Sequence, residues 1–432
     1  MNRKAAGSAM TKTLAALGAG ALVLQGVRLG MEVFGPSRPY HLESCELPPI
    51  DSPEFLGRMA CVTDAALDRD GRFTVLRNGA IFYPAELAAI DQAKHAINLQ
   101  AYEFQEGDFT RELLRRLTAC ARRGIQVRVL IDFIGSYKLG RDYFRGLTEA
   151  GGHFAWYHPI DLKQWPCFDH RSHRKLLTID GSTGFIGGAD YADHWIECEQ
   201  GKLPWRDTVF KVEGGLVSAL NATFSQNWVE STGEILFSSD HFPAGASAGE
   251  TTGMVVMGRP GYGTSSVRVL FQALLDSARS SIKITTPYFL PDRSARHALM
   301  RAAGRGVNVE ILTAGRDTDH ASVRRLSEAM SVKLIRSGVA IYEYQPSMIH
   351  AKLMTVDGVW SICGSTNFDH RSFSLNDEVN LAIRDRAITE TLEEQFQEDL
   401  ARSRRVTRET LRRQGISGKI FADVGWVLRR EE

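Results

Sequence analysis

The 432-residue sequence lacks several features that would assign it to a particular class of protein. Its six cysteines form no C-x-x-C pair and no spacing typical of zinc ligands. Its formal net charge of +1 removes the global basic field expected of a nucleic-acid-binding protein, so we expect no nucleic-acid partner. With 43% apolar and 24% charged residues, the composition is that of a globular protein and gives no sign of disorder, collagen or a multi-span membrane chain.

One apolar run, Leu14–Val27, lies near the N-terminus after three basic residues. This order is typical of a targeting segment, although the run is shorter than the ~20 residues that span a bilayer. Gly18, Gly20 and Gly26 disfavour a buried helix of the fold. We therefore expect residues 1–35 to be a membrane-targeting or signal-anchor segment, with a signal peptide or an interfacial helix as alternatives.

Two later segments repeat the same pattern: a strand, then a helix closed by a glycine, then a second strand. The strands of the first segment cover 97–104 and 127–131 around a helix over 109–123, and those of the second cover 282–289 and 307–312 around a helix over 294–304. Gly124 and Gly306 are the two helix stops. This order favours parallel strands covered by helices. We predict an α/β protein made of two repeated halves related by a pseudo-two-fold axis, with the active site at their interface.

The repeat divides the chain into expected parts: the first half over 36–235, a linker region over 236–260, the second half over 261–400 and a basic C-terminal tail over 401–432. The linker is inferred from its glycine, proline and serine content, although 252–257 also fits a strand opening the second half. Six arginines between Arg402 and Arg413 fit equally a solvated helix face and a docking patch for anionic lipid.

Each half then carries the motif H-x-K-x-x-x-x-D. The motif residues are His173, Lys175 and Asp180 in the first half, and His350, Lys352 and Asp357 in the second. The match continues at equal offsets through Gly187–Asp190 and Gly364–Asn367. A single copy would be a weak signal, whereas two copies after matching units are a strong one.

The motif suits a phosphodiester substrate. Residues two apart in an extended strand point to one face, so each histidine shares a face with its lysine. A two-fold arrangement would bring both pairs to one cleft. One imidazole would attack phosphorus and form a phosphohistidine, the other would protonate the leaving alcohol, and the lysines would stabilise the non-bridging oxygens. This chemistry requires no metal and no other cofactor, and the residues alone do not order the two histidines.

Other residues near the motifs are candidates for supporting roles. We expect Ser365, Asn367 and Asp190 to contact the substrate phosphate. Glu378 and Asp207 are candidates to hold the histidines in one tautomer, the alternative being strand-end salt bridges.

Asp180 and Asp357 each precede a glycine, at 181 and 358. We expect both to be structural, either capping that turn or pairing with a nearby basic residue.

These residues resemble the phospholipase D superfamily over about 73–399, and the segments 285–292, 342–352 and 364–380 resemble bacterial cardiolipin synthase. The resemblance implies two α/β halves with the active site between them, and His173, Lys175, His350 and Lys352 as catalytic residues, the first histidine being the nucleophile. It implies transfer of a phosphatidyl group from phosphatidylglycerol or a similar lipid to an alcohol acceptor. The implied setting is an anionic surface of the bacterial cell membrane, to which the chain is anchored or peripherally bound.

Two positions depart from the family pattern, Asp190 and Ser172, where the family has asparagine. A carboxylate at 190 would repel phosphate unless Lys175 or an arginine pairs with it. The competing functions are hydrolysis of the same lipids, cleavage of nucleic acid, which the low net charge disfavours, and a non-catalytic lipid-binding scaffold.

Overall fold

The computed structural model describes residues 40–43, 46–140, 142–160, 170–197, 203–243, 245, 247–260, 265–319 and 321–413. These residues belong to one compact unit, Tyr40–Gly415. The expected targeting segment 1–35 and the tail beyond 413 lie outside the described residues. Within the described ranges, no helix combines the length and the apolar character needed to cross a bilayer.

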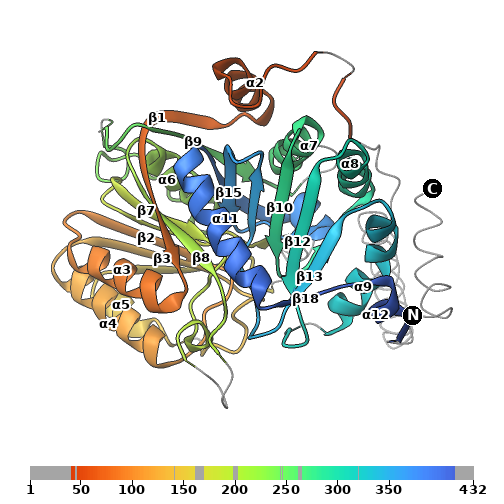
Figure 1. Cartoon of the computed structure of the whole chain (residues 1–432). Coiled ribbons are helices and arrows are strands. Elements are labelled where there is room, and N and C mark those ends of the chain that lie inside the picture. The colour runs from red at the N-terminus through yellow and green to blue at the C-terminus, as the bar shows by residue number, and fades with distance from the viewer. Residues whose placement is uncertain are drawn as a thin grey trace, which may run out of the picture. The chain divides into compact units, whose positions relative to one another are not determined.

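One large mixed sheet runs through both halves, and its strand order has two-fold symmetry (Figure 1). From the centre outward, the first half contributes β1 (Ala66–Arg77), β8 (Thr208–Glu213), β7 (Thr183–Gly187), β6 (Leu176–Ile179), β2 (Ala96–Ala101), β3 (Gln126–Asp132) and β4 (His153–Tyr157). The second half contributes, in the same order, β9 (Thr251–Gly258), β17 (Asn376–Arg384), β15 (Trp360–Gly364), β14 (Leu353–Val356), β10 (Ser281–Thr286), β12 (Asn308–Ala314) and β13 (Ala340–Tyr344), with β18 (Ser403–Arg405) at the edge. Because β1 pairs with β9, the two seven-strand series join into one sheet. The predicted α/β repeat is confirmed.

Short strands and helices complete the fold. The short strands are β5 (Arg171–Ser172), β11 (Phe289–Leu290) and β16 (Phe368–Asp369). The helices are α2 (Pro53–Thr63), α3 (Gly79–Asp91), α4 (Asp108–Arg122), α5 (Arg145–Glu149), the 3₁₀ turn η2 (Asp193–Trp195), α6 (Leu216–Thr232), α7 (Ser266–Ser277), α8 (Arg293–Gly304), α9 (Ala321–Arg336), α10 (His370–Ser374), α11 (Arg386–Ala401) and α12 (Arg408–Arg413).

Helices cover both faces of the first-half sheet, which explains why the parallel strands β2 and β3 are buried along almost their whole length. On β3, Val127, Val129 and Ile131 pack in the cluster that contains residues of α3 and α4, whereas Leu130 packs in the cluster that contains residues of α6. The polar side chains that alternate with the apolar ones, Asn98, Gln100 and Arg128, are buried as well. The core therefore lies in two layers, one on each side of the sheet.

The predicted strand–helix–strand units match the structure closely. β2 runs parallel to β3, and β10 runs parallel to β12. Gly124 and Gly306 follow α4 and α8 with φ of 85° and 87°, a backbone conformation that glycine adopts without steric cost. Both glycines thus end their helices as the sequence indicated.

The expected linker and tail contain regular structure. Part of the linker region forms β9, the strand that we gave as an alternative for 252–257, and β9 pairs with β1 and β17. In the tail, Arg404 pairs with Glu343 (2.5 Å), and Arg402 and Arg405 lie over the rings of Tyr344 and Tyr342. These three arginines attach β18 to β13, so they do not form one solvated helix face.

The motif aspartates hold the start of a neighbouring strand in each half. Asp180 accepts hydrogen bonds from the amides of Lys94, His95 and Ala96 at 2.7–2.9 Å. Asp357 accepts from the amides of residues 279–281 at 2.8–2.9 Å. Both aspartates have positive φ, 50° and 54°. Each carboxylate thus fixes the entry to a parallel strand of its own half, β2 or β10.

We predict that Asp180→Ala lowers the free energy of unfolding by about 1–3 kcal/mol, because it leaves three strand-entry amides without their acceptor. Urea unfolding at constant pH measures the change. Asp180→Asn is the matched control, since it keeps one acceptor oxygen and tolerates positive φ, and it should lose less. An alanine variant as stable as the parent would contradict this role.

Candidate functional site

The two H-x-K segments occupy equivalent places, directly before β6 and β14. The segments themselves are not assigned to strands, so the strand setting that we expected begins only at the residue after each lysine. The lysines still turn back over their histidines: Lys175 Nζ donates to the carbonyl of His173 (3.0 Å), and Lys352 Nζ donates to that of His350 (2.7 Å). All four side chains are buried.

Each H-x-K segment is bound to the backbone of the opposite half. The His173 amide donates to the carbonyl of Asp377 (2.9 Å), next to the parallel pair β5–β17. The His350 amide donates to the carbonyl of Arg206 (2.7 Å), next to the bridge between Arg206 and Ile349. The repeat thus places both histidines at the junction of the halves.

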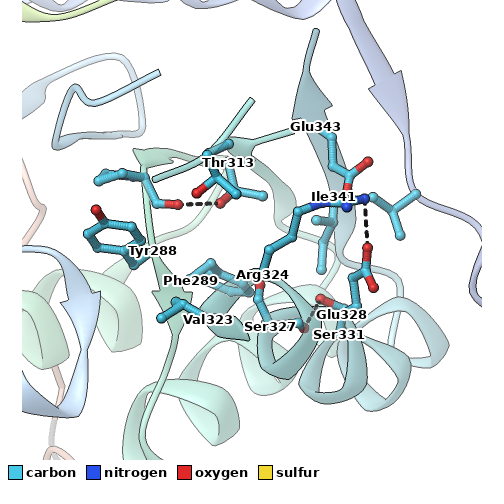
Figure 2. A pocket seen from close by; sticks show the side chains of 14 residues that line it. Tyr288, Phe289, Thr313, Val323, Arg324, Ser327, Glu328, Ser331, Ile341 and Glu343 are labelled. Carbon is cyan, nitrogen blue, oxygen red and sulfur yellow. Dashed lines mark hydrogen bonds and ion pairs between the residues drawn. The ribbon is translucent and has the colours of Figure 1, made fainter. Parts of the chain in front are cut away.

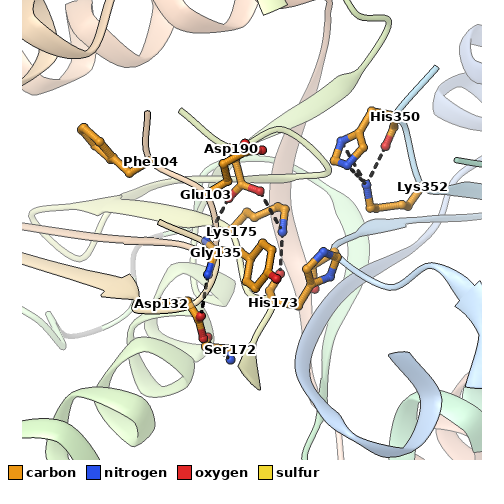
Figure 3. Close-up of polar contacts among 12 residues, drawn as sticks. Glu103, Phe104, Asp132, Gly135, Ser172, His173, Lys175, Asp190, His350 and Lys352 are labelled. Atoms are coloured by element: carbon orange, nitrogen blue, oxygen red, sulfur yellow. Dashed lines mark hydrogen bonds and ion pairs between the residues drawn. The ribbon is translucent and has the colours of Figure 1, made fainter. Parts of the chain in front are cut away.

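Each histidine side chain is also paired with a carboxylate of the opposite half. His173 Nδ1 lies 3.1 Å from Glu378 of the second half, and His350 Nδ1 lies 3.0 Å from Asp207 of the first. Both carboxylates are fully buried. Each imidazole is therefore oriented from across the junction through its Nδ1. The Nε2 atom of His350 lies 3.0 Å from Lys352 Nζ. Figure 3 shows both His-Lys pairs in one close-up, and the Lys175 ammonium is near enough to contribute to the lowered pKa of His350.

Burial controls the charge of the second pair. It lowers the pKa of His350 to about 4, with a further contribution from Lys352, whose Nζ lies 3.0 Å from His350 Nε2. Burial also lowers the pKa of Lys352 to about 8. Without substrate, His350 is neutral at physiological pH.

Burial alone would raise the pKa of Glu378, but the neighbouring His173 and the Ser365 hydroxyl outweigh it, so that the pKa is lowered. The Glu378 carboxyl group therefore stays charged and accepts from the imidazole.

The three residues expected to contact the phosphate differ in whether their side chains already have a partner in the protein. The Ser365 hydroxyl donates to Glu378 and accepts from the Val379 amide (3.0 Å). Its hydroxyl proton therefore supports the carboxylate that orients His173. Asn367 is buried, and its Oδ1 has no hydrogen-bond partner in the described structure. Asp190 pairs with Lys175 (3.1 Å), the pairing that a carboxylate at this place requires.

Sequence reasoning missed the aromatic and glycine residues that shape the site. The Tyr102 ring lies 5.3 Å from the His173 ring and 5.3 Å from Lys175 Nζ. Trp195 Nε1 donates to Asp207 (3.2 Å). A Cβ on Gly188 would lie 2.6 Å from Asp207 Oδ1, so this position cannot carry the serine found at the matching residue 365. In the sequence, the glycine at 188 in place of the serine at 365 was the one sign of this difference between the halves.

Two of the cavities in or beside the second half are lined by residues at or after the end of β12. One, of about 240 Å³, adjoins His350 through the tilted ring pair of His194 and Trp205. The other lies between α9, β12 and β13 (Figure 2), where Arg324 already pairs with Glu328 (2.7 Å) and Glu343 (2.8 Å). Only the first belongs to the candidate site. Among the described residues, no cluster of three or more histidine, cysteine or acidic side chains could hold a metal ion.

Comparison with known proteins agrees with this geometry. The family described as "Cardiolipin synthase, PLD-like domain" matches residues 87–199 and 271–400, one segment in each half. The chain is 32% identical over 362 residues to the major cardiolipin synthase of Bacillus subtilis (strain 168), covering 83% of this chain and 75% of that protein. It is 34% identical to cardiolipin synthase 2 of Bacillus anthracis, covering 76% of this chain and 64% of that protein.

Solved structures share the fold. The phosphatidylserine synthase of Haemophilus influenzae Rd KW20 superimposes with a TM-score of 0.63 at 15% identity, over 87% of this chain and 99% of that one. A polyphosphate kinase from Porphyromonas gingivalis gives a TM-score of 0.53 at 12% identity, over 87% of this chain and 52% of that one.

The duplicated fold and the paired motifs define an enzyme of the phospholipase D superfamily, of the phosphatidyltransferase class. Within it, the chain belongs to the cardiolipin synthase family. The family resemblance drawn from the sequence is thereby confirmed.

We predict that the Lys352 ammonium titrates near pH 8, because burial penalises its charged form, whereas an ordinary lysine titrates near 10.5. Between these values the unfolded chain binds more protons than the folded one, so this residue makes folding more favourable as pH rises. NMR of lysine-labelled protein, with Lys352→Arg to assign the signal, measures the titration. A midpoint near 10.5 would contradict the buried setting.

Proposed function

We propose that this enzyme transfers a phosphatidyl group from phosphatidylglycerol to an alcohol acceptor through a phosphohistidine intermediate. The observation that carries the proposal is the exchange of carboxylates between the halves: Glu378 and Asp207 each engage the Nδ1 atom of a histidine from the other half, so that Nε2 is the atom of each imidazole that would meet the substrate. Two lysines stand beside them, as an anionic phosphodiester requires.

In the first step, His173 Nε2 attacks phosphorus while Glu378 holds its Nδ1 proton. The N–P bond forms, the P–O bond to glycerol breaks, and His350 Nε2 gives its proton to the glycerol oxygen. In the second step, His350 takes the proton of the acceptor hydroxyl, whose oxygen attacks phosphorus and breaks the N–P bond. The products are the new phosphodiester and free His173.

In this order of steps, substrate binding has to raise the pKa of His350. His350 must be protonated to act as an acid, yet its pKa is about 4 in the empty site. A phosphodiester anion beside it would offset the effect of Lys352 and raise that pKa, so the acid would form when substrate binds. Because Asp190 already neutralises Lys175, Lys352 is the main cation available to the non-bridging oxygens.

The same residues would serve hydrolysis, with water in place of the alcohol, and the assay below separates the two. A nuclease activity is disfavoured by the net charge of +1. We propose that the enzyme works at the bacterial cell membrane, to which residues 1–35 attach it, and that the membrane supplies phosphatidylglycerol.

We predict that the purified full chain converts labelled phosphatidylglycerol in detergent, without added metal, to cardiolipin and glycerol in equal amounts. Thin-layer chromatography of the lipids and enzymatic measurement of glycerol give both products. Phosphatidic acid as the only lipid product would show that the enzyme hydrolyses the lipid and does not transfer the phosphatidyl group. Cleavage of DNA without lipid turnover would overturn the substrate class.

We predict that His173→Ala and His350→Ala each lower turnover by roughly 10⁴-fold or more, because each removes a group that forms or breaks a bond. His297→Ala, an exposed histidine on α8, is the matched control and should keep parental activity. After a denaturing quench, radiolabelled phosphatidyl group should remain on parental protein and be absent from His173→Ala. Label retained by His173→Ala and lost from His350→Ala would reverse the two roles.

A further inference from the structure

Three apolar side chains are exposed on loops that follow the parallel strands of the first half. Ile134 and Tyr137 follow β3, and Ile160 follows β4. Tyr137 is 68% exposed and Ile160 63%, and Ile134 is exposed as well. We call these three residues the apolar rim.

Hydrogen bonds attach the first part of the rim to the catalytic segment. Asp132 accepts from the amides of Ile134 (2.9 Å) and Gly135 (3.0 Å) through one oxygen. Its other oxygen accepts from the amide of Ser172 (3.0 Å), the residue before His173. Figure 3 shows Asp132, Gly135 and Ser172 beside His173. The loop that carries Ile134 and Tyr137 thus begins next to the proposed nucleophile.

A second attachment comes from the other side of the loop. The Ser136 hydroxyl donates to the carbonyl of Tyr102 (3.0 Å), whose ring lies 5.3 Å from that of His173. Tyr137 is the next residue. Its position is therefore fixed relative to the aromatic wall of the site.

The loop after β4 is held to the same segment. The carbonyl of His158 accepts from Arg171 (2.9 Å), and His158 Nδ1 lies 3.0 Å from the carbonyl of His170. Ile160 follows two residues later. All three rim residues therefore lie a few residues from contacts with the segment 170–173.

A phosphatidyl donor keeps its two acyl chains throughout the proposed reaction. The cavity of about 240 Å³ beside His350 offers them little, since its lining includes the charged side chains of Glu197, Arg316, Asp317 and Asp319. The phosphorus must therefore reach His173 while the acyl chains stay outside the protein. A bilayer surface in contact with the loops around the site meets this requirement.

We propose that the apolar rim docks the site onto a phospholipid bilayer, an inference that rests on the proposed phosphatidyl transfer. Aliphatic and tyrosine side chains partition into the membrane interface. Lys138 is exposed next to the Tyr137 ring, with Nζ 5.7 Å from its centroid. Arg316 is exposed at the equivalent end of β12 in the second half. The occupant is thus a bilayer that contains anionic lipid, such as the donor itself.

The test compares Ile134→Ser/Tyr137→Ser/Ile160→Ser with a control triple, Val62→Ser/Ile235→Ser/Phe237→Ser, both in the full chain. The control residues are exposed by 58%, 76% and 90%, so the control removes at least as much apolar surface as the rim variant. Turnover is measured on phosphatidylglycerol vesicles and on dissolved dihexanoyl-phosphatidylglycerol. Turnover, rather than vesicle binding, is the readout, because residues 1–35 are proposed to attach the chain to membranes.

We predict that the rim variant loses about tenfold or more in kcat/KM on vesicles and keeps its activity on the dissolved lipid within about twofold. The control triple should match the parent on both substrates. Parental activity of the rim variant on vesicles would overturn the docking proposal, and so would an equal loss on both substrates. A parent that turns over neither lipid would instead overturn the proposed function.

A second measurement is independent of turnover. In a His173→Ala background, a polarity-sensitive fluorophore on Tyr137→Cys should shift to the blue with vesicles that contain phosphatidylglycerol, and one on Phe237→Cys should not. Sedimentation velocity without lipid tests whether a second copy of the chain covers the rim instead. A parental dimer that the rim substitutions convert to monomer would assign the rim to a second copy of the chain and overturn docking.

Discussion

The exchange of carboxylates across the pseudo-two-fold axis is the interaction on which the rest of the site depends. Glu378 of the second half orients His173, and Asp207 of the first half orients His350. Both carboxylates are fully buried, and an unpaired buried charge is strongly destabilising. Each half therefore stabilises the other through the same contacts that orient the imidazoles. A single half would carry one histidine without its carboxylate and one carboxylate without its histidine.

The two exchanges are equivalent in place but differ in chemistry. Glu378 is supported by the Ser365 hydroxyl, whereas Asp207 is supported by the indole of Trp195, and Gly188 stands where the repeat would put a serine. These differences give the two imidazoles different surroundings. In the proposed mechanism, this departure from symmetry accompanies the division of nucleophile and acid roles between two histidines that the repeat makes equivalent.

The sequence was informative where the signal is local or repeated, and silent where the contact is formed only by folding. The βαβ units were predicted to within a few residues, because apolar periodicity and glycine stops act over short stretches of chain. The glycines and serines around β9 favoured a linker over 236–260, although residues 252–257 also fitted a strand. The contact of Glu378 with His173 follows from the parallel pairing of β5 with β17, and that of Asp207 with His350 from the bridge between Arg206 and Ile349, neither of which a local pattern encodes. Tyr102 reaches His173 because β2 pairs with β6, from a strand end 71 positions earlier in the chain.

The balance of charge in the site links substrate binding to proton uptake. Lys175 and Lys352 face three carboxylates, Asp190, Asp207 and Glu378, so with neutral imidazoles these five groups sum to −1. A phosphodiester anion adds a further negative charge, and a buried site cannot hold both charges without compensation. Protonation of one imidazole supplies that compensation and is also what the proposed general acid requires. Burial and the Lys352 ammonium lower the pKa of His350 to about 4 in the site without substrate, so the proposed mechanism requires the acid to form when the substrate binds.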